Sequence, residues 1–310
     1  MASIAYLGPA GTFTEAALLQ MAEAGLVPQS GAGPWQPLPV DSTIAALAAV
    51  RDGAADFACV PIENSIDGSI MPTLDSLAIG TPLQIFAELT LDVAFSIAVQ
   101  PGRTAADIRT LAAFPVAAAQ VRQWLAANLP AAQLRPAISN ADAAQQVADG
   151  LVDAAVSSPL AAAHRSLATL ADGVVDEPNA RTRFVLVGRP GPPPARTGAD
   201  RTSVVLRIAN APSALVSALT EFGIRGIDLT RIESRPTRTE LGTYVFFLDC
   251  VGHIDDDAVA EALKALHLRC TEVRYLGSWP TGEVAGAPPP QLDEAAGWLR
   301  ALRDGGGPAR

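Results

Sequence analysis

A glycine-rich turn close to the N-terminus has the residue types of a small-anion site. The turn spans residues 8–15 (GPAGTFTE), follows an apolar stretch, and places Thr12 and Glu15 at the spacing of a capping box. The free N–H groups and the positive dipole end of a helix N-terminus suit a carboxylate. Because the same features occur in turns that only cap a helix, this segment alone leaves both interpretations open.

A polar loop follows the apolar residues 57–62. It begins with Glu63, Asn64 and Ser65 and continues through Asp67. Polar side chains at the end of an apolar strand cost folding free energy unless they meet a ligand or one another. The loop therefore indicates either a ligand site at a strand end or a polar cluster that satisfies itself.

A threonine flanked by two arginines begins a further apolar stretch. Residues 179–184 read Asn-Ala-Arg-Thr-Arg-Phe. Strand alternation predicts that Thr182 and Phe184 share one face and that Arg183 lies on the other. Threonine is common in strands for structural reasons, so its position alone does not indicate catalysis.

The remaining composition argues against metal or cofactor chemistry. Lys264 is the only lysine, and it lies in an amphipathic stretch that is poorly suited to forming a Schiff base. The three histidines and three cysteines show neither metal-ligand nor disulfide spacing. We therefore expect no metal and no organic cofactor, with catalysis by acid–base or electrostatic means.

The net charge and the hydropathy pattern restrict the partners. The 310-residue chain has 22 Lys and Arg against 32 Asp and Glu, a net charge of −10, which argues against a nucleic-acid partner. No apolar stretch reaches the ~20 residues of a membrane span, and the N-terminus has no signal-peptide pattern. We expect a cytoplasmic protein with no membrane partner.

Up to residue 188 the sequence alternates predicted strands with predicted helices. The predicted strands cover residues 4–7, 57–62, two segments within 83–99, a short one near 111, 134–138, 154–157 and 184–187. The predicted helices comprise one from about Thr12, one capped by Asp41 and ending at Gly53, and residues 72–79, 116–127, 141–149 and 159–170. This α/β pattern predicts parallel sheets that bind ligands at the carboxyl ends of their strands, arranged as two lobes around a cleft.

A proline-rich linker separates this region from a smaller C-terminal unit. Residues 188–198 contain prolines in series, which favour extended backbone and allow loose tethering. The following segments, residues 203–208, 213–222, 228–234, 243–250, 255–266 and 271–277, predict the βαββαβ order of a ferredoxin-like sandwich. The tail from about residue 280 is rich in Pro and Gly, with a short helix predicted over 291–302.

Taken together, the motifs resemble those of the prephenate dehydratase family. The catalytic-region motifs are residues 6–15 (YLGPAGTFTE), 60–65 (VPIENS) and 182–184 (TRF), in the family's order. The C-terminal unit resembles an ACT domain, with 213–216 (SALV) and 233–236 (ESRP) as its signature segments. The resemblance implies a periplasmic-binding-protein-like catalytic domain over 3–189 (second lobe about 100–175), a linker over 190–201, an ACT domain over 202–280 and a tail over 281–310.

The resemblance also implies the activity and the site. The reaction is the decarboxylating dehydration of prephenate to phenylpyruvate in L-phenylalanine biosynthesis, catalysed by a lyase without a cofactor. The implied catalytic residues are Thr182, Asn64 and Glu63. The implied substrate-binding residues are Gly11, Thr12, Phe13, Thr14, Ser65, Gln120, Arg183 and Phe184. Ala113-Phe114-Pro115 stands where the family often has Ser-His-Pro, so no catalytic serine or histidine is expected there.

L-Phenylalanine is the implied effector. The implied pocket lies between paired ACT domains, so we expect a homodimer or homotetramer. Its residues are Asn210, Ser213, Ala214, Leu215, Val216, Glu233, Ser234, Arg235 and Pro236. Ser213 replaces the family's glycine, and its Cβ would narrow the pocket. Two alternatives stay open: an arogenate dehydratase, and a protein that binds an organic anion without catalysis.

Overall fold

The computed structural model describes residues 2–28, 35–237, 242–282, 286–290 and 293–305. The chain divides into two compact units. The first consists of Met1–Ser76 and Glu88–Arg189, and the second of Leu77–Ala87 and Pro190–Arg310. The second unit thus contains an eleven-residue segment from the middle of the N-terminal half.

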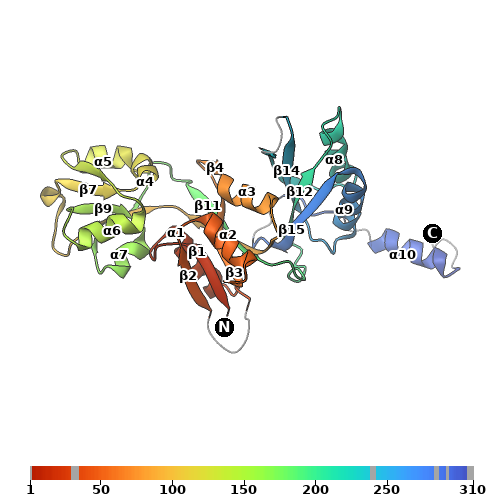
Figure 1. Ribbon diagram of the computed structural model, residues 1–310, viewed down its shortest axis with the longest axis horizontal. Helices are drawn as coiled ribbons and strands as arrows, with labels where there is room; N and C mark the ends of the chain where they lie inside the picture. Colours follow the sequence, from red (N-terminus) through yellow and green to blue (C-terminus); the bar gives the residue numbers. More distant parts are fainter. Residues whose placement is uncertain (1, 29–34, 238–241, 283–285, 291–292, 306–310) are drawn as a thin grey trace. The chain divides into compact units, whose positions relative to one another are not determined.

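The first lobe of the catalytic unit is built on a mixed sheet with the order β2-β1-β3-β11-β5. Figure 1 labels β1, β2, β3 and β11 of this sheet. Its strands are β1 (Ser3–Leu7), β2 (Gln36–Val40), β3 (Phe57–Asn64), β5 (Gln84–Asp92) and β11 (Arg181–Gly188), with the short β4 (Gly68–Ser69) paired to β3. Its helices are α1 (Phe13–Glu23), α2 (Thr43–Arg51) and α3 (Met71–Ala78). β1 is parallel to β2 and β3, whereas β11 runs antiparallel to β3.

The second lobe has a five-stranded sheet with the order β10-β6-β9-β7-β8. Its strands are β6 (Phe95–Val99), β7 (Thr110–Ala113), β8 (Gln133–Pro136), β9 (Ala154–Ser157) and β10 (Ala168–Val174). Its helices are α4 (Pro115–Gln120), α5 (Arg122–Asn128), α6 (Asn140–Ala148) and α7 (Pro159–His164), with a 3-10 turn at Ala105–Asp107. The two-lobed α/β architecture is confirmed.

Several local predictions are wrong. Both sheets are mixed rather than parallel, because β11 runs antiparallel to β3 in the first sheet and β6 runs antiparallel to both β9 and β10 in the second. Residues 159–170 form a six-residue helix and then enter β10. The predicted helix 116–127 breaks at Val121, where φ is −124°. Ser42, not Asp41, caps α2, because its hydroxyl accepts the Ala45 N–H. β2 was not predicted, since its five residues include two prolines.

Two crossing segments join the lobes. The chain passes from β5 to β6 at residues 92–95 and returns between β10 and β11 at residues 174–181. The segments are hydrogen-bonded to each other, because the Val93 N–H donates to the Ala180 carbonyl over 2.7 Å. An exposed ion pair of 2.8 Å links Arg181 and Asp92 beside this bond. The crossing lies directly before Thr182 in the chain.

The C-terminal unit has the predicted βαββαβ order. Its elements are β12 (Asp200–Arg207), α8 (Ala214–Gly223), β13 (Leu229–Pro236), β14 (Tyr244–Val251), α9 (Asp257–Arg269) and β15 (Glu272–Pro280). The antiparallel sheet has the order β13-β14-β12-β15. The core formed with the two helices includes Val204, Leu206, Phe222, Leu248 and Leu266. α10 (Asp293–Arg303) follows in the tail, and among the helices described none is long and apolar enough to cross a membrane.

The linker is fixed more firmly than its proline content suggests. The buried His253 ring bonds the Pro194 carbonyl through Nε2 at 3.0 Å. Its Nδ1 accepts the Asp255 N–H, so Nε2 carries the hydrogen and donates it. Arg196 also pairs with Asp256 at 2.7 Å. These contacts hold the linker on the C-terminal unit.

Candidate active site

Thr182 and Asn64 form a hydrogen-bonded pair on adjacent strands. They are register partners on β11 and β3, and Asn64 Nδ2 donates to Thr182 Oγ1 over 2.9 Å. Asn64 Oδ1 accepts the N–H groups of Ile66 and Asp67, at 2.8 and 2.9 Å, which fixes the orientation of the amide. The threonine oxygen is therefore an acceptor, and its own hydrogen remains for another group.

A bulge in β3 gives this pair its position. Arg183 is opposite Glu63, but the next residue, Phe184, is opposite Pro61, so Ile62 is the extra residue. A bulge re-aims the side chains that follow it and increases the local twist. Here it turns the end of β3 so that Asn64 meets Thr182. Phe184 is only 2% exposed and belongs to the core.

The glycine-rich turn folds into a closed helix cap. Thr12 is the N-cap of α1: its hydroxyl donates to the Leu7 carbonyl at 2.8 Å and accepts the Glu15 N–H at 3.3 Å. The Glu15 carboxylate reaches back to the Gly11 N–H and also accepts from the Tyr6 hydroxyl. Burial, followed by the nearby Glu15 charge, raises the pKa of Tyr6 to about 12. The predicted capping box thus forms, except that Glu15 accepts the N–H of Gly11 and not the N–H of the N-cap residue Thr12.

The same turn contacts the second lobe. Gly11 has φ +94°, and a Cβ there would lie 2.7 Å from the Cβ of Ala161 in α7. The Ser158 hydroxyl donates to the Gly11 carbonyl. Phe13 packs edge-on against Phe95 of β6, with ring centroids 5.5 Å apart. Gly11 and Phe13 therefore hold the lobes together. A helix leaves its first N–H groups without partners inside the helix, and in α1 the Glu15 N–H is the one that Thr12 accepts.

Arg183 does not have the surroundings expected of a substrate-binding arginine. Its side chain is 8% exposed, and it pairs with Glu63 on β3 at 2.9 Å and with Glu88 on β5 at 3.2 Å. Because β11 lies between β3 and β5, the three residues form a row of charges across the sheet. Glu63 is thus committed to Arg183 and is not placed as an acid or base of its own.

The Ser65 hydroxyl is also occupied within the fold, and Thr14 is buried. The Ser65 hydroxyl donates to the Asn179 carbonyl at 2.9 Å and accepts the Arg181 N–H at 2.8 Å, so it has no hydrogen left for a carboxylate. It joins the polar loop to the start of β11. The Thr14 side chain is buried, with the residue only 4% exposed.

A cavity of about 510 Å³ lies between the two lobes. Ile66 and Asp67 line it from the first lobe, and the second lobe contributes α4, α5 and the segment before β11. Gln120 lines it with a buried Oε1 that has no hydrogen-bond partner among the described residues. Thr182 and Asn64 are not among the lining residues, but Asn64 is bonded to the backbone of both first-lobe lining residues.

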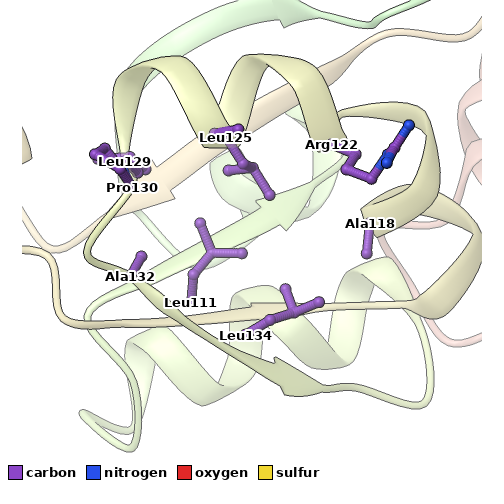
Figure 2. A pocket seen from close by; sticks show the side chains of 9 residues that line it. Leu111, Ala118, Arg122, Leu125, Leu129, Pro130, Ala132 and Leu134 are labelled. Carbon is purple, nitrogen blue, oxygen red and sulfur yellow. The ribbon is translucent and has the colours of Figure 1, made fainter.

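Two further cationic side chains, those of Arg181 and Arg122, belong to the same region. Arg181, directly before Thr182, is exposed and pairs with the exposed Asp92. Arg122 lines the interlobe cavity. It also lies beside a second hollow of about 200 Å³ in the second lobe, whose other lining residues are apolar or proline (Figure 2). That hollow offers one charge and an aliphatic wall, so the interlobe cavity is the better candidate for a polar ligand.

The predicted effector segments lie at one end of the ACT-like unit. Ser213 is the N-cap of α8 and has a left-handed backbone, with φ 65° and ψ 0°. Val216 is exposed on the first turn of α8. The other segment, residues 233–236, ends the edge strand β13, in which intermediate and exposed residues alternate. Glycine adopts this left-handed backbone without the steric cost that a Cβ atom brings, which explains why a glycine fits position 213.

Sequence reasoning missed two charged residues that the structure brings to the site. Glu88 lies inside an otherwise apolar stretch, and a carboxylate in such a stretch signals a buried partner. Arg122 is two residues beyond Gln120, in a segment whose pattern predicts a continuous helix. Neither residue belongs to a motif, so only the folded structure shows their place.

Comparison with known proteins agrees with the sequence motifs. A family model for prephenate dehydratase matches residues 4–192, and a model for the ACT domain matches residues 202–268. Prephenate dehydratase of Mycobacterium tuberculosis is 79% identical over 305 residues, which cover 98% of this chain and 95% of the relative.

Solved structures are similar over the same length. The crystal structure of a prephenate dehydratase from Arthrobacter aurescens in complex with L-Phe aligns with a TM-score of 0.85 and 39% identity, covering 97% of this chain and 99% of the other. A structure described as a novel type of quorum quenching acylase aligns with a TM-score of 0.78 and 30% identity, covering 90% and 98%.

Proposed function

This chain belongs to the prephenate dehydratase family, and we propose that Thr182 is the hydroxyl donor of its reaction, with Asn64 as the residue that orients it. The enzyme is a carbon–oxygen lyase that converts prephenate to phenylpyruvate. Loss of carbon dioxide and hydroxide from prephenate yields an aromatic ring, which makes the reaction strongly downhill. The barrier lies in the departure of hydroxide, which needs a hydrogen bond or a proton as it leaves.

A single observation carries this assignment: Thr182 Oγ1 accepts a hydrogen bond from an amide whose orientation two backbone N–H groups fix. With its oxygen occupied as an acceptor, the threonine can direct its hydrogen to the departing hydroxyl. The Asn64 dipole also makes the hydroxyl a better donor, because hydrogen bonds in a chain polarise one another. Threonine is a weak acid, so positioning must supply much of the acceleration.

For the two carboxylates of prephenate we propose separate groups of donors. The N–H groups in the first turn of α1, apart from the Glu15 N–H that Thr12 accepts, and the positive end of the helix dipole suit one carboxylate. Gln120, whose amide lines the interlobe cavity, is the candidate from the second lobe. Arg181 is a better cationic candidate than Arg183. Its present partner is the exposed carboxylate of Asp92, and giving up an exposed ion pair for a substrate carboxylate costs little free energy.

We further propose that L-phenylalanine binds the ACT domain and inhibits the enzyme. Support comes from the 39%-identical relative, whose crystal structure is a complex with L-Phe. The proposed pocket combines the start of α8, near Asn210 and Ser213, with the end of β13 at residues 233–236. In ACT domains such pockets form between paired domains, so the regulated species should be a homodimer or a homotetramer.

The choice between prephenate and arogenate can be tested with the purified protein. Each substrate is supplied separately, and phenylpyruvate and phenylalanine are measured as the respective products. We expect kcat/KM to favour prephenate. A preference for arogenate would leave the lyase assignment intact, but arogenate and not prephenate would then be the substrate.

A further inference from the structure

Strand β5 belongs to both compact units. Its residues 84–87 are part of the C-terminal unit, whereas residues 88–92 are part of the catalytic unit. Glu88 is therefore the first catalytic-unit residue after a segment that packs with the ACT domain. A single peptide bond joins Glu88 to that segment.

The segment before Glu88 is held closely by β15 and by the linker. An added Cβ at Gly277 of β15 would lie 2.3 Å from the Ile85 carbonyl oxygen, so the two backbones are in direct contact. Arg274, also on β15, donates to the carbonyls of Leu77 and Gly80 at 3.2 and 3.1 Å. The Gln84 side chain accepts the Gly191 N–H at 3.1 Å. Any shift of β15 therefore displaces the start of β5.

On the catalytic side, Glu88 is one end of the row of charges. Its side chain is 5% exposed and pairs with Arg183, which in turn pairs with Glu63. Arg183 and Glu63 directly adjoin Thr182 and Asn64, the register partners that form the proposed donor pair. Separating a buried ion pair leaves a costly unpaired charge, so Arg183 has to follow Glu88 when β5 moves.

We propose that Glu88 is a positioning residue: through Arg183 it sets the geometry of the Thr182–Asn64 pair, and through β5 it conveys to that pair the state of the ACT domain. This inference rests on the proposed function. It assigns the Glu63–Arg183–Glu88 row to alignment of the donor rather than to binding of substrate. It also gives phenylalanine a route to the reaction, since an effector acts only by favouring one arrangement of a shared structure.

The test compares Glu88→Gln with wild type in the full-length enzyme. Glutamine keeps the shape and one acceptor oxygen but removes the charge. We expect kcat to fall by about 3- to 30-fold with a smaller change in KM, because Glu88 does not touch substrate. The ratio of turnover without and with saturating phenylalanine should fall at least about threefold, while phenylalanine binding, measured by calorimetry, stays within about twofold.

Glu221→Gln is the matched control. Glu221 in α8 is an equally buried glutamate, 5% exposed, that pairs with two arginines, Arg225 and Arg269, within the ACT domain. Glu221→Gln removes the charge of a glutamate with a buried side chain, as Glu88→Gln does, but should leave kcat unchanged. A purely structural role for Glu88 would produce the same pattern in both variants and would overturn the proposal.

Arg274→Gln provides a second measurement that leaves the catalytic sheet intact, and it decides the question if Glu88→Gln does not fold. It should reduce inhibition while phenylalanine still binds. Wild-type inhibition in this variant would overturn the proposed route through β5. Failure of the proposed function is recognised separately, because in that case removing the Thr182 hydroxyl would leave turnover intact.

Discussion

Replacing Thr182 with valine removes the proposed donor with little change of shape. Valine keeps the branched side chain that suits a strand and loses only the hydroxyl. The residue is 8% exposed, and the hydroxyl makes a 2.9 Å bond with Asn64. Its removal leaves one amide hydrogen of Asn64 without this partner, which should cost about 1–2 kcal/mol of stability.

That cost is too small to unfold the enzyme. Domains are commonly stable by ~5–15 kcal/mol, so the variant stays folded at the assay temperature. The loss in turnover should be much larger: removal of a positioned proton donor typically costs about 100- to 10,000-fold. Even the lower figure corresponds to about 2.7 kcal/mol of transition-state stabilisation. Stability and activity should therefore separate clearly.

The assay measures phenylpyruvate formation from prephenate, alongside thermal unfolding of the same samples. Thr182→Ser is the matched control: it retains the hydroxyl, loses a methyl group, and should keep turnover within about tenfold of wild type. If the valine variant retains more than a tenth of wild-type turnover, or if serine is as inactive as valine, the hydroxyl is not the donor.

Three further predictions address other parts of the molecule. Ser213→Gly should raise stability by up to about 1 kcal/mol, because it relieves a left-handed backbone at a non-glycine residue; a lower denaturation midpoint would contradict this. Hydrogen bonds from the Arg109 N–H and then from Thr110 hold the pKa of Asp153 below its usual range. The ionised Asp153 therefore stabilises the fold above about pH 4, and this stabilisation is lost as the pH falls through the pKa of Asp153 in the folded protein. Asp153→Asn should therefore lower Tm at neutral pH, with a difference from wild type that shrinks on acidification. Turnover should survive exhaustive chelation, since the described residues bring no three His, Cys, Asp or Glu side chains together; a loss restored by a divalent metal would refute this.

The sequence by itself determined those features that depend on local pattern. The βαββαβ order of the C-terminal unit could be predicted because hydrophobic periodicity distinguishes helix from strand over short windows. The cap of α1 was predictable from Thr12 and Glu15 because its partners are close in the chain. The motif residues Asn64 and Thr182, 118 positions apart, could be identified by resemblance to the family, but their hydrogen bond could not be derived from the sequence.

The tertiary structure decided how those residues are used. Strand alternation predicted Arg183 on the face opposite Thr182, but only strand order shows that it lies between Glu63 and Glu88 and is buried. The bulge at Ile62 and the return strand β10 also depend on pairing with distant strands, which local periodicity does not encode. Buried charges, bulges and shared strands are set by partners brought together only on folding, and this is why the residues that align Thr182 appear in the structure and not in the motifs.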